Sequence, residues 1–202
     1  MAIIQNFFNF SKLTTVVTNE AKKWNNGSLK ETQPDAVPML TKYWKNVGIT
    51  KYTAANFASD SFQNNHPWSA VYISWVMNQV DGSFPGSSAH RVYSESALKN
   101  RNAGSGGWNL FSLSREKKKI KAQVGDVLVK PRAKGKKDGT DKEKAAYRAS
   151  HGDLVWKVSG GKAYLAGGNL GNTNDTTIRV NLNSDGSYPK NPNGYLVVLK
   201  KM

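Results

Sequence analysis

The sequence predicts an α+β domain, with helices in the first half of the chain and a small antiparallel sheet in the second. Three observations lead to this prediction. Apolar residues recur at helical spacing up to residue 100, short segments rich in β-branched residues follow, and tight turns separate those segments. The length of 202 residues suits one domain, and 38% hydrophobic residues make the chain too apolar to be disordered.

Helical periodicity marks four segments of the first half. We expect helices at 12–26, 35–47, 69–80 and 87–100. Ser11 is a suitable cap for the first helix and Gly27 a suitable stop. The third helix begins after Pro67 and is closed by Asp81-Gly82.

The second half contains short strand-like segments. We expect strands at 126–130, 153–158, 162–166, 176–182 and 195–200. Turn residues at 159–161 and 184–186 favour hairpins, and therefore an antiparallel meander. The stretch 131–150 has seven Lys/Arg, three Asp/Glu and no apolar periodicity, so we interpret it as an exposed basic insertion.

The charge of the chain favours anionic partners. The net charge is +15, and residues 115–150 carry 13 Lys/Arg against five Asp/Glu. Nucleic acid, anionic lipid and an acidic cell-wall polymer are the partners that such a field attracts. This run has almost no aromatic residues between its charges, so nucleic acid is the least favoured of the three.

The composition also excludes several kinds of chemistry. The chain has no cysteine, which excludes disulfides, thiolate metal sites and a cysteine nucleophile. No apolar stretch is long enough for a transmembrane helix. The first ten residues lack the pattern of a secretory signal. We therefore expect a protein made in the cytoplasm that another system delivers to the envelope.

Ser69 is the first candidate for chemistry. It lies where the third predicted helix begins, and free backbone N–H groups at a helix start favour negative charge. That position suits a nucleophile or an oxyanion. The alternative is that Ser69 only caps the helix.

Two histidines and their neighbours are the other candidates. His90 on the fourth predicted helix is either a catalytic partner or a packed histidine. Strand alternation places His151 and Asp153 on one face of a strand, and the next strand can bring Asn169 beside His151. A histidine oriented by a polar side chain is typical of a hydrolytic triad. Asn169 is equally suited to a turn, and His90, His151 and Asp153 together are a plausible zinc set.

The order of these patterns resembles that of the papain-like amidases of the NlpC and CHAP kind. Ser69 in Trp68-Ser69-Ala70-Val71-Tyr72 falls on the position of their cysteine. The chain is more closely similar to an uncharacterised bacterial and phage domain family within that superfamily. Five blocks carry this resemblance in order: 67–77, 84–93, 125–127, 151–155 and 167–169.

The resemblance implies a papain-like domain at 61–202, with residues 1–60 as a helical decoration packed on it. It implies a cell-wall hydrolase that cuts an amide or peptide bond in peptidoglycan without a cofactor or metal. Ser69 would be the nucleophile, its N–H part of the oxyanion hole, His151 the general base, and Asn169 or Asp153 the group that orients it. Because a serine hydroxyl is far less acidic than a thiol, it depends on a well-aligned base.

Two other functions remain open. The first is a non-catalytic structural or binding component of a phage particle or contractile injection apparatus, which keeps the amidase fold and has lost its chemistry. The second is nucleic-acid binding, which charge alone supports. The expected partners are peptidoglycan or another anionic wall polymer, together with a phage-tail or injection-apparatus protein if the chain is delivered in that way.

Overall fold

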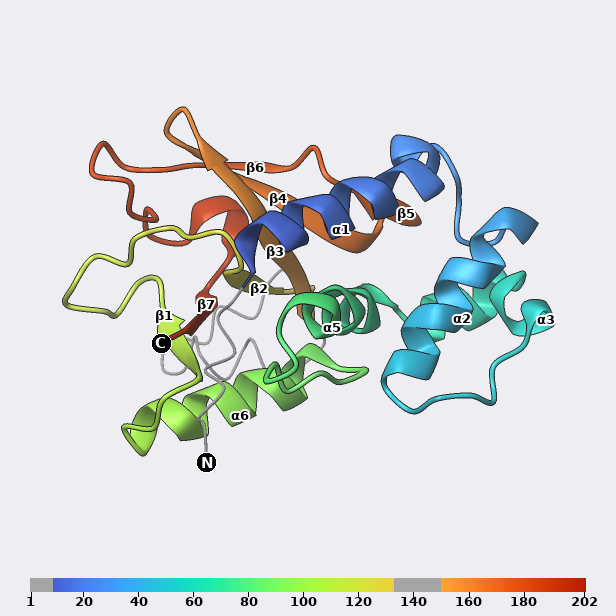
Figure 1. The fold of residues 1–202 in the computed structure, drawn as a ribbon, viewed down its shortest axis with the longest axis horizontal. Coiled ribbons are helices and arrows are strands. Elements are labelled where there is room, and N and C mark those ends of the chain that lie inside the picture. Colours follow the sequence, from blue (N-terminus) through green and yellow to red (C-terminus); the bar gives the residue numbers. More distant parts are fainter. Residues whose placement is uncertain (1–8, 133–149) are drawn as a thin grey trace.

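The computed structural model describes residues 9–132 and 150–202, and it confirms the α+β prediction (Figure 1). The α-helices are α1 (Phe10–Lys23), α2 (Val37–Asn46), α3 (Ala54–Phe57), α4 (Asp60–Asn65), α5 (Ser69–Val80) and α6 (His90–Asn102). Short 3-10 turns lie at η1 (Asn25–Gly27), η2 (Pro34–Ala36) and η3 (Pro192–Gly194). The predicted basic insertion at 131–150 lies outside the described residues except at its ends.

The strands form one antiparallel sheet in which the order differs from a simple meander. They are β1 (Trp108–Ser112), β2 (Val127–Pro131), β3 (Ser150–Ser159), β4 (Lys162–Leu170), β5 (Thr173–Asp175), β6 (Arg179–Asn181) and β7 (Val197–Lys201). Their spatial order is β1-β7-β2-β3-β4-β5, and β6 pairs with β4. The C-terminal strand β7 is therefore inserted between β1 and β2, and the predicted hairpin of β3 and β4 turns at Gly160-Gly161.

Alternation along the strands gives the sheet two apolar faces. On one face, Val127, Val129 and Leu154 pack in the same core as the helices. On the other face, Leu128 and Val155 belong to a second, smaller core. Helix α5 packs across β3 and β4 on the first face, and α1 and α2 pack against α5 (Figure 1). This arrangement brings the start of α5 to β3.

The helices of the first 60 residues share their core with the rest of the domain. Leu13 of α1 and Leu40 of α2 are fully buried in the cluster that includes Ile73 of α5 and Leu199 of β7. These helices thus complete the main core. Among the described helices, none has the length and apolar character needed to cross a membrane.

Candidate functional site

Ser69 is the first residue of α5, as the sequence predicts, but its side chain does not cap the helix. The N-cap position belongs to Trp68, and no side chain there accepts a capping hydrogen bond. The Trp68 indole is buried, stacks on Trp24 at 4.8 Å between ring centroids, and donates to Glu31 Oε2 at 2.5 Å. These contacts hold the backbone immediately before Ser69.

The Ser69 hydroxyl lies against His90, the first residue of α6. Ser69 Oγ is 2.7 Å from His90 Nε2, and the other ring nitrogen, Nδ1, is hydrogen-bonded to the Tyr93 hydroxyl. Tyr93 follows His90 by three residues on the same helix, so the two side chains share a face. Ser69, His90 and Tyr93 form a continuous buried chain, with exposed fractions of 1%, 4% and 0%.

Residue 152 of β3 is a glycine, and the absence of a side chain there makes room for the His90 imidazole. A Cβ atom at Gly152 would lie only 2.6 Å from His90 Nδ1. The imidazole therefore rests directly on the strand backbone. A glycine at this position is a steric requirement for the Ser69–His90 pair.

The hydrogen-bond partners of Ser69 determine where its hydroxyl hydrogen points. Arg132 Nη2 lies 3.3 Å from Ser69 Oγ, and a guanidinium can only donate. His90 Nε2 is the one acceptor within reach of the hydroxyl among the contacts of the described residues. We therefore assign the Ser69 proton to the bond with His90, which leaves Nδ1–H to donate to Tyr93. This is the tautomer that a general base needs.

The surroundings keep His90 neutral. Burial lowers the pKa of His90 well below its ordinary value of 6.5, and the nearby charges of His151 and Arg132 lower it further. Burial likewise raises the pKa of Tyr93, so its phenol stays protonated. A neutral imidazole can accept the Ser69 proton at physiological pH.

This shifted pKa predicts a pH dependence of stability. Below pH 6.5 His90 binds a proton in the unfolded chain but stays neutral in the folded chain, where its pKa is well below 6.5. The free energy of unfolding should therefore fall as pH drops below 6.5, and the His90 contribution should be constant above it. Urea titrations of wild type and His90→Gln from pH 5 to 8 check this: their stability difference should change below pH 6.5. A constant difference would contradict a neutral buried His90.

The structure does not form the expected hydrogen bond between Ser69 and His151. Strand alternation places His151 and Asp153 on the sheet face that bears Val155 and the smaller core, whereas α5 lies on the other face. His151 Nε2 instead contacts Asp153 Oδ1 at 2.9 Å. The His151 ring still lies near the site, with its centroid 6.2 Å from that of His90.

The carboxylate of Asp153 is held on that second face by an aromatic hydroxyl. Tyr195 donates a hydrogen bond to Asp153 Oδ2, and Lys130 lies over the Tyr195 ring at 4.5 Å. His151, Asp153 and Tyr195 thus form a second polar chain. Strand β3 separates it from the Ser69–His90–Tyr93 chain.

Asn169 does not reach His151. The pairing of β3 with β4 ends at Leu154 and Ala166, and beyond it β4 pairs with β5. Asn169 lies in the irregular part of that second pairing with φ of 58°, a left-handed conformation that suits a turn. No hydrogen bond joins it to His151 within 9–132 and 150–202. Asn169 is therefore a turn residue, which was the alternative to a place beside His151.

The proposed zinc set is not assembled either. Within the described ranges, no three His, Asp or Glu side chains have an arrangement that could hold a metal ion. Both ring nitrogens of His90 are instead engaged in hydrogen bonds with Ser69 and Tyr93, while His151 Nε2 contacts Asp153.

The sequence analysis gave no role at this site to Arg132 or Glu31, and it did not foresee the hydrogen bond between Tyr93 and His90. The spacing of His90 and Tyr93 on one helix was a usable signal. Arg132 follows β2, and its Nε atom also donates to the backbone oxygen of Ser150 at 3.0 Å. Burial raises the pKa of Glu31. Burial also lowers the pKa of Arg132, and the carboxylates of Glu31 and Asp153 offset this only in part. Nothing in the local sequence connects Glu31 or Arg132 to Ser69.

Comparison with protein families gives a match over most of the chain. No match to the chain is found among curated proteins or among solved structures. A family model described as "Uncharacterized protein conserved in bacteria" matches residues 39–195. This range begins within α2 and ends before β7, and it includes Ser69, His90, Tyr93, Arg132 and His151. The chain therefore belongs to this bacterial family, DUF2272.

Proposed function

We propose that the chain is a serine hydrolase of the bacterial cell wall, which cuts an amide or peptide bond in peptidoglycan. The observation that carries this proposal is the Ser69 hydroxyl at the start of α5, 2.7 Å from the neutral imidazole of His90. Ser69 is the nucleophile, His90 the general base, and Tyr93 the group that orients the imidazole.

The proposed reaction has two steps. Ser69 Oγ attacks the carbonyl carbon of the scissile bond while its proton moves to His90 Nε2. His90 then gives this proton to the leaving nitrogen, and the carbon–nitrogen bond breaks to leave an acyl-enzyme. A water molecule then attacks the ester carbonyl while His90 takes its proton, and His90 returns that proton to Ser69 Oγ as the ester bond breaks and the carboxylic acid product leaves.

The start of α5 and Arg132 are suited to stabilise the oxyanion. The first N–H groups of a helix have no partner within it, and their dipoles favour a developing negative charge. Helix α5 is 12 residues long. Arg132 already donates to Ser69 Oγ, and its guanidinium is positioned to donate to the carbonyl oxygen instead.

Substrate entry requires a local rearrangement, because Ser69 is only 1% exposed. Arg132 is an exposed residue that binds both the Ser69 hydroxyl and the Ser150 backbone. Exchange of the Arg132–Ser69 hydrogen bond for one with the substrate carbonyl would open the hydroxyl. Arg132 therefore links substrate binding to activation of the nucleophile.

Charge and family resemblance support peptidoglycan as the substrate. A net charge of +15 favours residence on an anionic envelope. The blocks around Ser69 and His151 resemble those of the NlpC and CHAP amidases, and α5 packs across β3 and β4 as a nucleophile helix would. We propose a papain-like fold on the same grounds, with the base supplied by His90 instead of His151.

The test is release of soluble fragments from purified peptidoglycan by wild type and Ser69→Cys. The thiol introduced by this substitution would lie at a helix N-terminus beside Arg132, which should lower its pKa below the ordinary value of about 8.5. Activity should persist or rise in this variant and be abolished by an alkylating reagent. Ser69→Ala, which keeps the helix and removes the nucleophile, is the matched control.

The low exposure of Ser69 and the absence of a cysteine favour a second function. In that case the chain is a non-catalytic component of a phage particle or injection apparatus. Wild type and Ser69→Cys would then both be inert on walls from several bacteria. Such a result would replace the hydrolase proposal with this one.

A further inference from the structure

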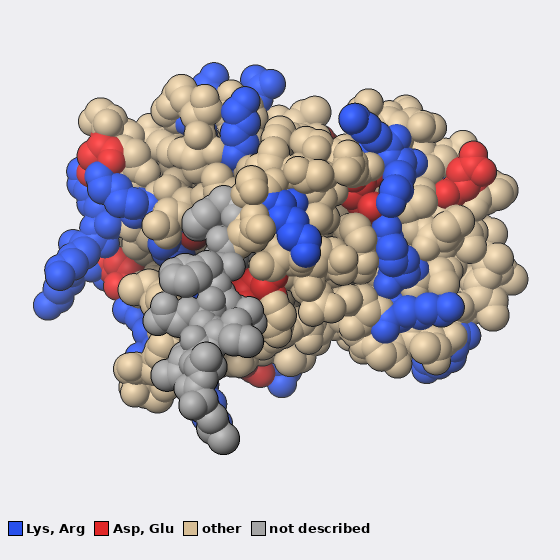
Figure 2. All heavy atoms as spheres, viewed as in Figure 1, with Lys and Arg blue, Asp and Glu red and all other residues tan. Residues whose placement is uncertain are grey.

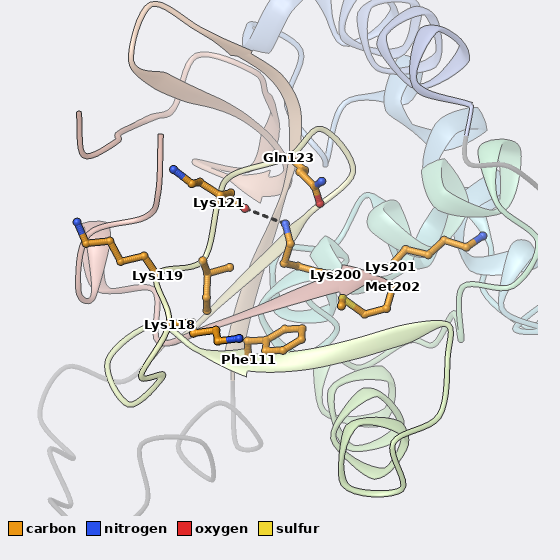
Figure 3. Close-up of a pocket in the computed structure, with 9 residues that line it drawn as sticks. Phe111, Lys118, Lys119, Lys121, Gln123, Lys200, Lys201 and Met202 are labelled. Atoms are coloured by element: carbon orange, nitrogen blue, oxygen red, sulfur yellow. Dashed lines mark hydrogen bonds between the residues drawn. The ribbon is translucent and has the colours of Figure 1, made fainter. Parts of the chain in front are cut away.

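A basic surface pocket lies at the edge of the sheet formed by β1 and β7. Its volume is about 410 Å³. Figure 3 shows the lining side chains, which come from β1, from β7 and the residue after it, and from the segment 118–123: Phe111, Lys118, Lys119, Ile120, Lys121, Gln123, Lys200, Lys201 and Met202. Five of the nine residues are lysines and none is acidic, so the pocket is suited to an anion.

The two lysines of β7 have different roles. Lys200 is directed toward the segment 121–123 in Figure 3 and donates to the Lys121 backbone oxygen at 2.9 Å. Its ammonium is also fixed by Asp126 at 2.7 Å. Lys201 extends in the opposite direction, where Asp81 lies 2.8 Å from its ammonium. Lys200 therefore forms a rigid base of the pocket, and Lys201 contributes only its apolar stem.

The lysines at 118–121 supply the accessible charge. Lys119 and Lys121 share one carboxylate, that of Asp185, at 3.2 and 3.9 Å. Lys118 has no hydrogen bond or ion pair with any described residue. Four ammonium groups therefore lie at the pocket, those of Lys118, Lys119, Lys121 and Lys200. Only two carboxylates, of Asp185 and Asp126, pair with them, which leaves an excess of two positive charges. Figure 2 shows Lys and Arg atoms along this end of the molecule with Asp and Glu atoms among them, and a further group of Lys and Arg atoms over the opposite end.

A second pocket continues the surface on the other side of residues 118–120. Its volume is about 430 Å³, and it shares Lys118, Lys119 and Ile120 with the first. Its lining also includes Lys190, Asn183, Glu116 and Tyr188. The Glu116 carboxylate is neutralised by Arg101 at 2.6 Å, and Tyr188 is only 5% exposed and donates its hydroxyl hydrogen to Asp126, so neither opposes an anion with a free charge nor offers an open ring face. The two pockets thus flank one basic segment, and an extended ligand that lies across it would contact both. This shape fits a linear chain better than a single small anion.

The aromatic content of the first pocket argues against nucleic acid. Phe111 is its one aromatic residue, and the guanidinium of Arg101 lies over that ring at 4.8 Å. A base would have to compete with Arg101 for the stacking surface that single-stranded nucleic acids use. The pocket provides positive charge without a free aromatic face.

We propose that these two pockets bind a linear polyanion without bases, of the kind found in cell-wall polymers. Lysine ammonium groups act as point charges toward phosphate and carboxylate alike, so the shared chemistry is a flexible chain of repeated anionic groups. This binding site is distinct from the Ser69 site. Ser69 is on α5, which packs on β3 and β4, and β2 separates β3 from β7.

The test is binding of fluorescent polyphosphate and poly-L-glutamate, measured by anisotropy at low and high salt. Lys118→Gln/Lys119→Gln should weaken binding about tenfold at low salt and reduce its salt dependence. The matched control is Lys12→Gln/Lys22→Gln, which removes two exposed lysines of α1 and the same charge. Because both substitutions are on the surface, neither variant should lose its fold.

Each result of the binding measurement either supports or overturns the proposal. A selective loss in the pocket variant supports it, and the polymer that binds more tightly identifies phosphate or carboxylate as the natural group. An equal loss in both variants would show attraction by net charge alone and overturn it. Tighter binding of a single-stranded oligonucleotide with the same lysine dependence would also overturn it. Binding is measured without turnover, so this result is independent of the Ser69 chemistry.

Discussion

His90→Gln should lower kcat/KM for the proposed peptidoglycan hydrolysis by about 10³-fold or more, whereas His151→Gln should lower it by less than about tenfold. His90 Nε2 lies 2.7 Å from the Ser69 hydroxyl and accepts its proton. His151 is hydrogen-bonded to Asp153 and faces the other side of β3. The measurement is a comparison of initial rates for the two variants at the same pH.

Folding controls make this comparison interpretable. Both histidines are buried, so each substitution should cost about 1 kcal/mol of stability through an altered hydrogen bond. Thermal unfolding of both variants should confirm that each is folded at the assay temperature. A large loss of activity in His151→Gln, with normal activity in His90→Gln, would show that His151 is the general base and His90 is not.

Gly152→Ala should be the second severe change, although residue 152 carries no functional group. Its Cβ would lie 2.6 Å from His90 Nδ1 and 3.3 Å from Ile73, so the imidazole must shift. A displacement of about 1 Å in a catalytic group can cost about 10²-fold in rate. We expect that loss in kcat, together with about 1–3 kcal/mol of destabilisation from overpacking.

Gly82→Ala is the matched control, because a Cβ at Gly82 meets nothing within 4 Å. This variant should retain both stability and rate. If Gly152→Ala were as active as Gly82→Ala, the contact between His90 and the β3 backbone would have no role in the proposed catalysis.

Local signals predicted most of the fold. Helix α5 begins and ends at the predicted residues, since Pro67 and Asp81-Gly82 bound a continuous apolar segment. The short helices α3 and α4 were missed because they depend on the caps Thr53 and Ser59 more than on periodicity. The place of β7 between β1 and β2 is a long-range pairing, and no local pattern encodes it.

The site was predicted in part, for a similar reason. Ser69 and His90 were both identified, and their proximity depends on how α5 and α6 pack on β3. The alternation that correctly placed His151 and Asp153 together could not say which sheet face they share. The packing of Leu154 beneath the helices determines the face, because residues 153 and 155 on either side of it must then point to the opposite face.

The central claim is that His90 activates Ser69, and covalent labelling by a fluorophosphonate tests it most directly. Intact-mass analysis should show one adduct per chain, and peptide mapping should place it on Ser69. Labelling should be absent in Ser69→Ala, much slower in His90→Gln, and close to the wild-type rate in His151→Gln. An unlabelled wild-type protein, or labelling at Ser69 that depends on His151 and not on His90, would contradict the account.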